Sequence, residues 1–440
     1  MLPPEQQRDL ELAVWQYFSD KGYSESAKSL QRESSALAAS EPAKSEDRIL
    51  ERKWLTILKL QARILELEKK LALAEDLLSK SVRTLNPSAP GESKASDQLI
   101  NPVLKLSKAY KGHKDVVACV AAHESEPVFA SGSGDSTIRL YDYELQDQLV
   151  ILKGHTHSVN CLAWTKEELV SGSSDMYLKI WKSANKTNAL DFREFYCYKT
   201  LIGHEHSVSH VINLPETDLS VSVSRDRTIR VWDRTSGYCR KTVEDVHDDW
   251  IRSCDANARH LLTTGNDKKV FVFDLEHVMT FETKQLRQNT SYINCFDAHD
   301  NYIESIKVYK SGKLGPDETV AVTASRDKTI GVWNYMTGTL LMSLTGHENW
   351  VKDIEIFEDA NFLISAGEDK TLRIWNLAKK KQVFIEHAAH DHFVSCLALH
   401  KGFKIVVSGS VDKSSKVWRL ANSTSQDVLN SLVNGGAHDK

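Results

Sequence analysis

The sequence lacks the features that mark membrane-spanning, secreted and disulfide-stabilised proteins. No apolar run approaches the roughly 20 residues that a bilayer-spanning helix needs. The chain does not begin with a basic segment followed by an apolar one, so we expect neither a secretory signal nor membrane insertion. The 7 cysteines are odd in number and include no C-x-x-C pair. Disulfide frameworks and zinc sites are therefore not expected, and a reducing compartment is favoured.

A strong excess of one charge is also missing. The 56 Lys and Arg residues nearly balance the 60 Asp and Glu residues, which gives a net charge of -4. This balance gives no reason to expect nucleic acid as a partner. The motifs G-x-S-x-G, H-E-x-x-H and the Walker loop do not occur, so we predict no enzyme activity, no metal and no cofactor. At 440 residues the chain is long enough for two or more folding units.

What the sequence does contain is one spacing that recurs seven times. An aspartate is followed six residues later by an aromatic residue, and a histidine precedes the aspartate by 20 to 28 residues. The seven sets are His113, Asp135 and Tyr141; His155, Asp175 and Trp181; His204, Asp226 and Trp232; His247, Asp267 and Phe273; His299, Asp327 and Trp333; His347, Asp369 and Trp375; and His390, Asp412 and Trp418. A period of 42 to 52 residues with Gly-His and Trp-Asp signatures is typical of WD-repeat blades. We therefore predict a mainly β fold, a seven-bladed WD-repeat β-propeller over residues 103–421, preceded by α-helical segments.

A Ser or Thr lies four residues before each of these aspartates. We predict that each set forms a hydrogen-bonded tetrad, because a buried indole N–H needs an acceptor and an aspartate can cap a tight turn. Two complete examples are His204, Ser222, Asp226 and Trp232, and His347, Ser365, Asp369 and Trp375. Ser, His and Asp also suggest a catalytic triad, but seven copies at fixed repeat positions indicate a scaffold. Tyr141 and Phe273 lack the indole, so blades 1 and 4 should be less tightly tied.

Some segments lie outside the simple repeat. Residues 103–110 have the pattern of a strand and precede the first Gly-His, while little strand sequence remains after Trp418. We therefore expect residues 103–110 to supply the outer strand of the last blade and to close the ring. Residues 183–198 and 311–318 lengthen the repeats that contain them. Either segment could be a binding loop or a tolerated insertion, and for 311–318 we favour an insertion.

The residues before the propeller predict a helical dimerisation region. Residues 6–35 form a small amphipathic unit that resembles the LisH dimerisation motif, and residues 47–82, without Gly or Pro, predict a short coiled coil. The apolar column of the coiled coil repeats every seven residues, at Leu50, Ile57, Ile64, Leu71 and Leu78. Because the facing column is mostly polar, a weak parallel dimer and a single helix folded onto the propeller remain open. Residues 83–102 predict a flexible linker, and residues 422–440 a polar tail.

Differences between the repeats predict a binding face at the top of the ring. Three residues after the histidine, blades 4 to 7 carry the aromatic residues Trp250, Tyr302, Trp350 and Phe393. Arg252 follows Trp250 by two residues, and the positions next to the aspartates of blades 3 to 7 carry the cations Arg225, Arg227, Lys268, Arg326, Lys328, Lys370 and Lys413. Exposed aromatic and arginine side chains are typical of protein interfaces. Because the chain is slightly acidic overall, this basic sector suggests an acidic protein partner.

The order of LisH motif, coiled coil and seven WD repeats resembles the lissencephaly / nuclear distribution protein family of dynein regulators. The resemblance is most specific in Trp-Asp-Arg-Thr-Ser-Gly-Tyr-Cys (232–239), Gly-His-Glu-Asn-Trp-Val (346–351) and the start of the coiled coil (50–61). It implies that the propeller binds the motor domain of the cytoplasmic dynein heavy chain. The implied binding positions are Arg225, Arg252, Arg326, Trp350 and Lys370, with Trp250, Tyr302 and Phe393 as further top-face candidates. Blade 4 departs from the pattern, with Val246 in place of glycine, which leaves its loop geometry open.

The resemblance also implies a biological setting. It implies a homodimer, a NudE-type coiled-coil adaptor as a second partner, and association with microtubules. The expected location is the cytoplasm and cytoskeleton, at microtubule plus ends and spindle poles, with roles in transport, nuclear migration and mitosis during cell division. An alternative is a LisH–WD substrate-recognition or scaffold subunit of a ubiquitin ligase or co-repressor complex, because such proteins share both modules.

Overall fold

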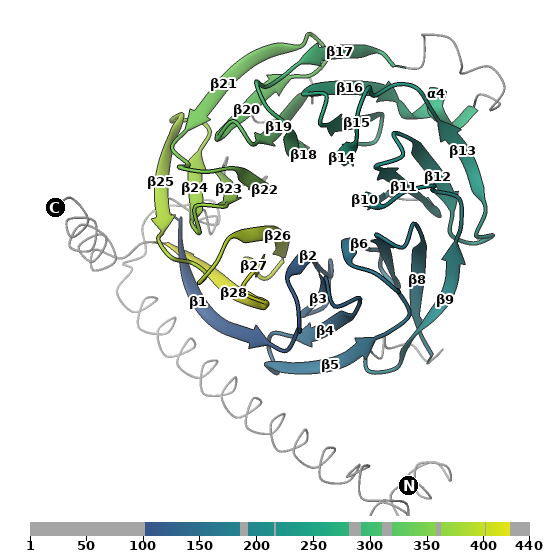
Figure 1. The fold of residues 1–440 in the computed structure, drawn as a ribbon. Coiled ribbons are helices and arrows are strands. Elements are labelled where there is room, and N and C mark those ends of the chain that lie inside the picture. Colours follow the sequence, from purple (N-terminus) through teal and green to yellow (C-terminus); the bar gives the residue numbers. More distant parts are fainter. Residues whose placement is uncertain are drawn as a thin grey trace, which may run out of the picture. The chain divides into compact units, whose positions relative to one another are not determined.

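Seven antiparallel four-stranded sheets form a closed ring in the computed structural model (Figure 1). The structure describes residues 102–184, 192–214, 217–280, 292–309, 319–357, 362–400 and 402–422. The predicted LisH motif, coiled coil and tail, nearly all of the linker, and the 311–318 segment lie outside the described residues. Within the described part of the chain, no helix is long and apolar enough to cross a membrane.

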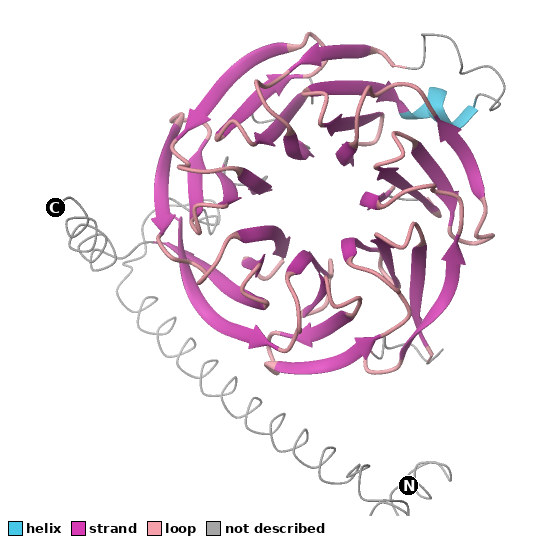
Figure 2. Ribbon diagram, viewed as in Figure 1, coloured by secondary structure: helices cyan, strands magenta, loops and turns pink. Residues whose placement is uncertain are grey.

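Each blade contains four strands, taken here in chain order. Blade 1 consists of β2 (Val117–Ala122), β3 (Val128–Ser133), β4 (Ile138–Asp142) and β5 (Asp147–Leu152). Blade 2 consists of β6 (Val159–Trp164), β7 (Glu168–Ser173), β8 (Leu178–Ser183) and β9 (Phe195–Leu201). Blade 3 consists of β10 (Val208–Asn213), β11 (Leu219–Ser224), β12 (Ile229–Asp233) and β13 (Cys239–Val243). Blade 4 consists of β14 (Ile251–Ala256), β15 (His260–Gly265), β16 (Lys269–Asp274) and β17 (Asn294–Asp297), with the short helix α4 (Leu275–Thr280) after β16 (Figure 2).

The remaining blades follow the same plan. Blade 5 consists of β18 (Ile303–Val308), β19 (Val320–Ser325), β20 (Thr329–Asn334) and β21 (Thr339–Thr345). Blade 6 consists of β22 (Val351–Phe357), β23 (Phe362–Gly367), β24 (Leu372–Asn376) and β25 (Lys381–Glu386). Blade 7 consists of β26 (Val394–His400), β27 (Ile405–Ser410), β28 (Ser414–Asn422) and, from the start of the described chain, β1 (Pro102–Lys111). The fold is therefore the seven-bladed β-propeller that the repeats predict.

The first and last strands close the ring. Strand β1 pairs antiparallel with β28, from Pro102 opposite Asn422 to Lys111 opposite Ser414. This pairing confirms that the segment around 103–110 completes the last blade, although β28 extends further past Trp418 than the sequence suggested. The innermost strands also form a complete circle, because each one contacts the innermost strand of the next blade, including β26 with β2 (Figure 1).

The blades pack against each other on both faces, which explains their apolar middle strands. Every residue of β3, β11, β19, β23 and β27 is buried. Small residues let neighbouring blades approach closely: a Cβ added to Gly132 would lie 2.6 Å from the Cys119 sulfur and 2.7 Å from a Val159 methyl. Cys119, Cys161, Cys254 and Cys396 are buried and Cys197, Cys239 and Cys295 are half-buried, all as free thiols. The cysteines in the innermost strands thus serve as small buried packing residues, as predicted.

Part of the 183–198 insertion belongs to the core. The side chains of Phe192 and Phe195 are stacked with ring centroids 5.6 Å apart, and both are buried. They also contact the Trp164 ring, at 5.9 Å each. The described end of this insertion therefore covers apolar surface of blade 2 and its neighbour, and it is not a free binding loop.

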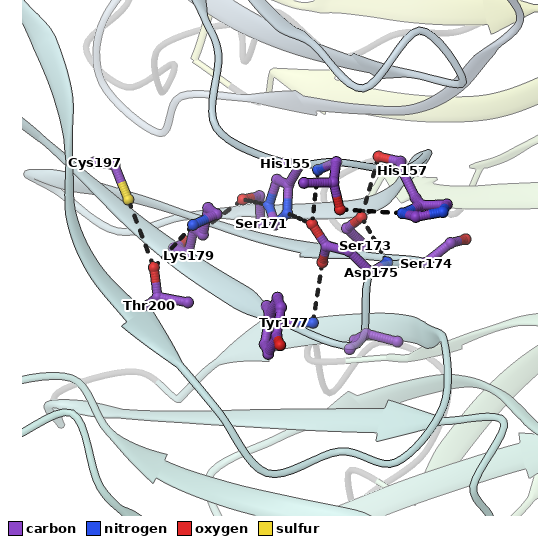
Figure 3. Close-up of polar contacts among 12 residues, drawn as sticks. His155, His157, Ser171, Ser173, Ser174, Asp175, Tyr177, Lys179, Cys197 and Thr200 are labelled. Carbon is purple, nitrogen blue, oxygen red and sulfur yellow. Dashed lines mark hydrogen bonds and ion pairs between the residues drawn. The ribbon is translucent and has the colours of Figure 1, made fainter.

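The predicted tetrads are present in the structure. In blade 2, His155 Nδ1 lies 2.8 Å from Asp175 Oδ2, and His155 Nε2 lies 2.8 Å from the Ser171 hydroxyl, as Figure 3 shows. The Trp181 indole N–H donates to the same hydroxyl at 2.8 Å. The same His–Asp and His–Ser/Thr contacts recur in all seven blades. The indole bond recurs in the five tryptophan blades.

The turn after each tetrad aspartate has one fixed backbone conformation. The residue that follows the aspartate has a positive φ in all seven blades, at Ser136, Met176, Arg227, Lys268, Lys328, Lys370 and Lys413. In five blades the next residue is Thr or Ser, and its hydroxyl donates to the aspartate. A left-handed conformation is unfavourable for residues with a Cβ. The surrounding hydrogen bonds therefore impose this turn on whatever residue occupies it.

Burial and hydrogen bonding shift the pKa values of the tetrads in blades 3 and 6 and of His210, which lines the central channel. Burial lowers the pKa of His204 and His347, although the aspartate of each tetrad opposes this shift. For Asp226 and Asp369 burial favours protonation, but the hydrogen bonds from histidine, threonine and backbone outweigh it and lower the pKa. Burial, together with nearby Lys307, lowers the pKa of His210 to about 4. These histidines are therefore neutral in the folded protein at neutral pH.

The propeller is expected to lose stability as the pH falls. The folded-state pKa values of these histidines lie below the unfolded value of about 6.5, so the unfolded chain binds more protons below that pH. The free energy of unfolding should therefore be largest above pH 7, fall between pH 6.5 and 5, and fall again below pH 4 as the aspartates protonate. Thermal unfolding across pH 2.5 to 8 measures this, and the His210→Gln variant should give a shallower fall between pH 7 and 5. A melting temperature that rises on acidification would contradict this explanation.

Ring closure is expected to depend on the buried face of β1. Leu104 is 5% exposed and packs in the core between blades 6 and 7, whereas Leu106 in the same strand is 53% exposed. Leu104→Ala should lower the free energy of unfolding by about 2–4 kcal/mol, because it removes buried methyl groups and leaves a cavity. The control Leu106→Ala should change it by less than about 0.5 kcal/mol. Urea unfolding of both variants measures the free energy of unfolding, and equal losses would contradict a role of the buried face of β1 in closing the ring.

Candidate functional site

The predicted aromatic and basic residues lie at one edge of the ring because backbone hydrogen bonds join their loops. In every blade, the residue before the tetrad aspartate donates its N–H to the carbonyl of the residue three positions after the histidine. The seven bonds run from Gly134 to Val116 (2.9 Å), Ser174 to Ser158 (2.8 Å), Arg225 to Ser207 (3.0 Å), Asn266 to Trp250 (2.9 Å), Arg326 to Tyr302 (2.9 Å), Glu368 to Trp350 (2.8 Å) and Val411 to Phe393 (3.1 Å). Each top-face aromatic residue therefore lies beside the aspartate turn of its own blade.

Arginines from one blade stack on aromatic rings from the next blade. The Arg225 guanidinium of blade 3 lies 4.3 Å from the ring centroid of Trp250 in blade 4. The Arg326 guanidinium of blade 5 lies 4.1 Å from that of Trp350 in blade 6 and 5.3 Å from that of Tyr302. Arg252 lies 5.6 Å from the Tyr302 ring. Cation–π contacts of this kind hold long arginine side chains in a defined place. We call these six residues, Arg225, Trp250, Arg252, Tyr302, Arg326 and Trp350, the aromatic–cationic face.

A single carboxylate lies beneath this face. Glu304 accepts from Arg326 Nε through one oxygen, and its other oxygen lies 3.2 Å from Arg252 Nη1 and 2.9 Å from Lys352 Nζ. The three cations come from blades 5, 4 and 6, respectively. The Glu304 side chain is 7% exposed, whereas those of Arg252, Arg326 and Lys352 are between 18% and 22% exposed. One buried acid therefore connects three blades of the predicted basic sector.

The charge state of Glu304 follows from these neighbours. Burial alone would favour the protonated carboxyl, but Lys352, Arg252 and Arg326 outweigh it and lower the pKa of Glu304. Burial lowers the pKa of Arg252, although Glu304 opposes that shift. A carboxylate with three cationic donors is a strongly charge-assisted arrangement. Glu304 is thus ionised at neutral pH, and the cluster keeps a net positive charge.

Glu304 and Lys352 are residues that the sequence analysis missed, and they contact the predicted cations or each other. Both lie five residues after the repeat histidine, the position that Arg252 occupies in blade 4. The other blades have small neutral residues there, namely Ala118, Asn160, Ser209 and Ser395. All seven positions line the mouth or wall of the central channel, whose volume is about 650 Å³. A comparison of this position across the repeats would have identified the charged sector of blades 4 to 6.

Two predicted site residues stand apart from the aromatic–cationic face. Lys370 is exposed in its left-handed turn, and within the described residues no side-chain contact joins it to the six. Phe393 lines the channel and contacts His392, with ring centroids 4.4 Å apart. Arg225 is exposed and Trp250 is 37% exposed, while the other four residues of the face are half-buried. The structure therefore brings together six of the eight predicted positions, and the two most accessible of the six lie at the blade 3–4 boundary.

The residue types of this face are those of a recognition surface. In the part of the chain that the structure describes, no group of three or more His, Cys, Asp or Glu side chains could hold a metal ion. The tetrad serines are fully buried and already hydrogen-bonded to histidine, so they are structural. Exposed arginine and tryptophan side chains, such as Arg225 and Trp250, are suited to carboxylates and apolar groups of a protein partner.

Comparison with known proteins agrees with this architecture. The family described as WD domain, G-beta repeat matches residues 104–142, 146–182, 195–233, 290–334, 338–376 and 379–419. The matches omit residues 234–289, where Val246 and Phe273 replace the glycine and the tryptophan of the repeat. The structure nevertheless forms blade 4, because His247, Thr263 and Asp267 still make their tetrad contacts.

The chain is also similar to curated fungal proteins over most of its length. It is 33% identical over 380 residues to nuclear distribution protein nudF of Aspergillus niger, covering 83% of this chain and 82% of that protein. It is 30% identical over 343 residues to nuclear distribution protein PAC1 of Arthroderma otae, covering 73% and 71%. It is 32% identical over 333 residues to nudF of Emericella nidulans, covering 72% and 70%. With its WD repeats and this extent of similarity, the chain belongs to the lissencephaly / nuclear distribution protein family, which includes nudF and PAC1.

Proposed function

We propose that this chain is a non-catalytic homodimeric regulator of cytoplasmic dynein, which binds the motor domain through the aromatic–cationic face. The observation that carries the proposal is the set of cation–π contacts across blades 3 to 6, which joins Arg225 to Trp250 and links Arg252, Tyr302, Arg326 and Trp350. Four of these positions, together with Lys370, are those at which the family resemblance implies dynein binding. Membership of the nuclear distribution protein family supports the same pathway.

The proposed mechanism is a shift in the conformational equilibrium of the motor. A regulator that binds one state of the motor more tightly than another increases the population of that state. Two propellers linked by the proposed coiled coil would raise the effective concentration of the second face once the first has bound. A NudE-type adaptor and association with microtubules, at plus ends and spindle poles, complete the proposal for transport, nuclear migration and mitosis.

Loss of three arginines is expected to weaken binding to the motor domain. The variant Arg225→Ala, Arg252→Ala, Arg326→Ala should bind at least about 100-fold more weakly, because each interface arginine typically contributes about 1 kcal/mol or more. A titration of the purified full-length protein against the dynein motor domain measures this affinity, with circular dichroism to verify the fold.

A matched control removes the same charge elsewhere. The variant Lys114→Ala, Lys153→Ala, Lys166→Ala changes three exposed lysines of blades 1 and 2 and should bind like the unaltered protein. Equal losses in the two variants would indicate a general charge effect and would sink the assignment of the face. Recovery of ubiquitin-ligase or chromatin subunits in place of dynein, in a pull-down from cell extract, would favour the alternative function.

The coiled-coil proposal predicts a change in oligomeric state. Ile57→Glu together with Ile64→Glu places charges in the apolar column and should shift the full chain from dimer to monomer. The control Gln61→Glu alters a polar column position and should keep the dimer. Analytical ultracentrifugation distinguishes the two states, and a monomer already present in the unaltered protein would refute this part of the proposal.

A further inference from the structure

We propose that Glu304 is a positioning residue for the aromatic–cationic face, holding its arginines in a pre-formed arrangement for a carboxylate-bearing segment of the partner. The inference rests on the proposed function for the identity of that partner. It departs from a simple charge argument, in which an acid within a basic face can only weaken the binding of an acidic partner.

The hydrogen-bond geometry supports positioning over competition. An arginine has five N–H donors. Within the described residues, Arg326 donates only its Nε–H to Glu304, and Arg252 donates its Nε–H to Asn266 and one Nη1–H to Glu304. Both guanidinium groups therefore retain N–H groups that can donate hydrogen bonds to a carboxylate of the partner. Glu304 uses one N–H group of each arginine, and both side chains remain partly exposed, at 18% for Arg326 and 19% for Arg252.

The stacking contacts depend on the same anchor. Arg326 is held between the Tyr302 and Trp350 rings, 5.3 Å and 4.1 Å from their centroids, while Glu304 fixes its Nε. A free arginine side chain samples many rotamers, and immobilising it upon binding costs affinity. Glu304 is 7% exposed, and its contact with Arg326 orders the arginine side chain when the protein folds. The entropy cost of fixing this side chain therefore does not reduce the affinity for the partner.

One substitution distinguishes positioning from a pure charge effect, because the two predict opposite changes in affinity for an acidic partner. Glu304→Gln keeps the size of the side chain but replaces one carboxylate oxygen with an NH₂ donor. Since Arg326 uses one oxygen and Arg252 and Lys352 share the other, either amide orientation directs a donor at a cation. The variant makes the face more positive, so a pure charge effect predicts tighter binding to an acidic partner. Positioning predicts weaker binding.

A neighbouring acid provides the matched control. Glu368 lines the same channel, is half-buried, and occupies the position in blade 6 that Arg225 and Arg326 occupy in their blades. Its backbone N–H bonds to the Trp350 carbonyl, and no ion pair involves its carboxylate among the described residues. Glu368→Gln therefore changes the net charge of the face by the same amount without removing a hydrogen bond or ion pair of the Glu304 cluster.

The experiment measures motor-domain affinity for full-length variants that retain the melting temperature of the unaltered protein within a few degrees. Glu304→Gln should bind roughly tenfold more weakly or worse, and Glu368→Gln should bind equally or more tightly. In an Arg326→Ala background, the effect of Glu304→Gln should shrink to less than about threefold, as expected for coupled residues. Equal or tighter binding of Glu304→Gln, or an undiminished effect in that background, would overturn the inference.

A second readout keeps the inference testable if dynein is not the partner. In full-length protein labelled with 5-fluorotryptophan, the ¹⁹F resonance of Trp350 is assigned from its loss in Trp350→Phe. Glu304→Gln should shift or broaden this resonance, because Arg326 leaves the ring, and Glu368→Gln, which keeps the Arg326 anchor, should change it less. A protein that fails to bind the motor domain but shows this response refutes the proposed function and retains the positioning role. An unchanged Trp350 resonance refutes the positioning role itself.

Discussion

The structure depends on the buried hydrogen bonds between the loop that precedes each blade and the turn between its second and third strands. The histidine of the loop contacts the aspartate of the turn at 2.7 to 3.0 Å in all seven blades. The same pair of segments is joined by the backbone bond that ends on the residue three after the histidine. These contacts place both variable positions at one edge of the ring. The scaffold is thus repeated, and the proposed binding residues occupy positions that the scaffold fixes in space while leaving the residue type free.

The seven blades share this frame but differ in charge. In blades 4 to 6 the innermost strands carry Arg252, Glu304 and Lys352 at one position, where other blades have alanine, asparagine or serine. Stacking across blade boundaries then links Arg225 to Trp250 and Arg326 to Trp350. Because each contact joins two blades, the arrangement of the face depends on ring closure, and therefore on the pairing of β1 with β28. The proposed binding face and the stability of the ring therefore depend on the same pairing of strands.

Much of this could be predicted from the sequence, because repeats fix the relative positions of equivalent residues. The number of blades, the tetrads, the closing strand and the aromatic row all follow from spacing. Glu304 was missed because its three partners lie on three blades, and a lone acid in a basic sector has no local signature. The left-handed turn shared by Met176 and Lys370 was also missed, since Ser, Met, Arg and Lys all occupy it. The packing of Phe192 and Phe195 in the core does not follow from the sequence, which predicts a binding loop or an insertion over 183–198. Their contact, Trp164, lies on another strand and about 30 residues earlier in the chain.

We propose that the aromatic–cationic face of blades 3 to 6 binds the partner, while the repeated tetrads form the scaffold. The most direct test is a structure of the full-length protein bound to the dynein motor domain by electron cryomicroscopy. We expect carboxylates of the motor to accept hydrogen bonds from Arg225 and from the Arg326 N–H groups that Glu304 does not use. Trp250 and Trp350 should lie beside them, with Glu304 still bound to its three cations. A complex formed through the outer strands or the opposite edge of the ring, with these residues exposed to solvent, would contradict it.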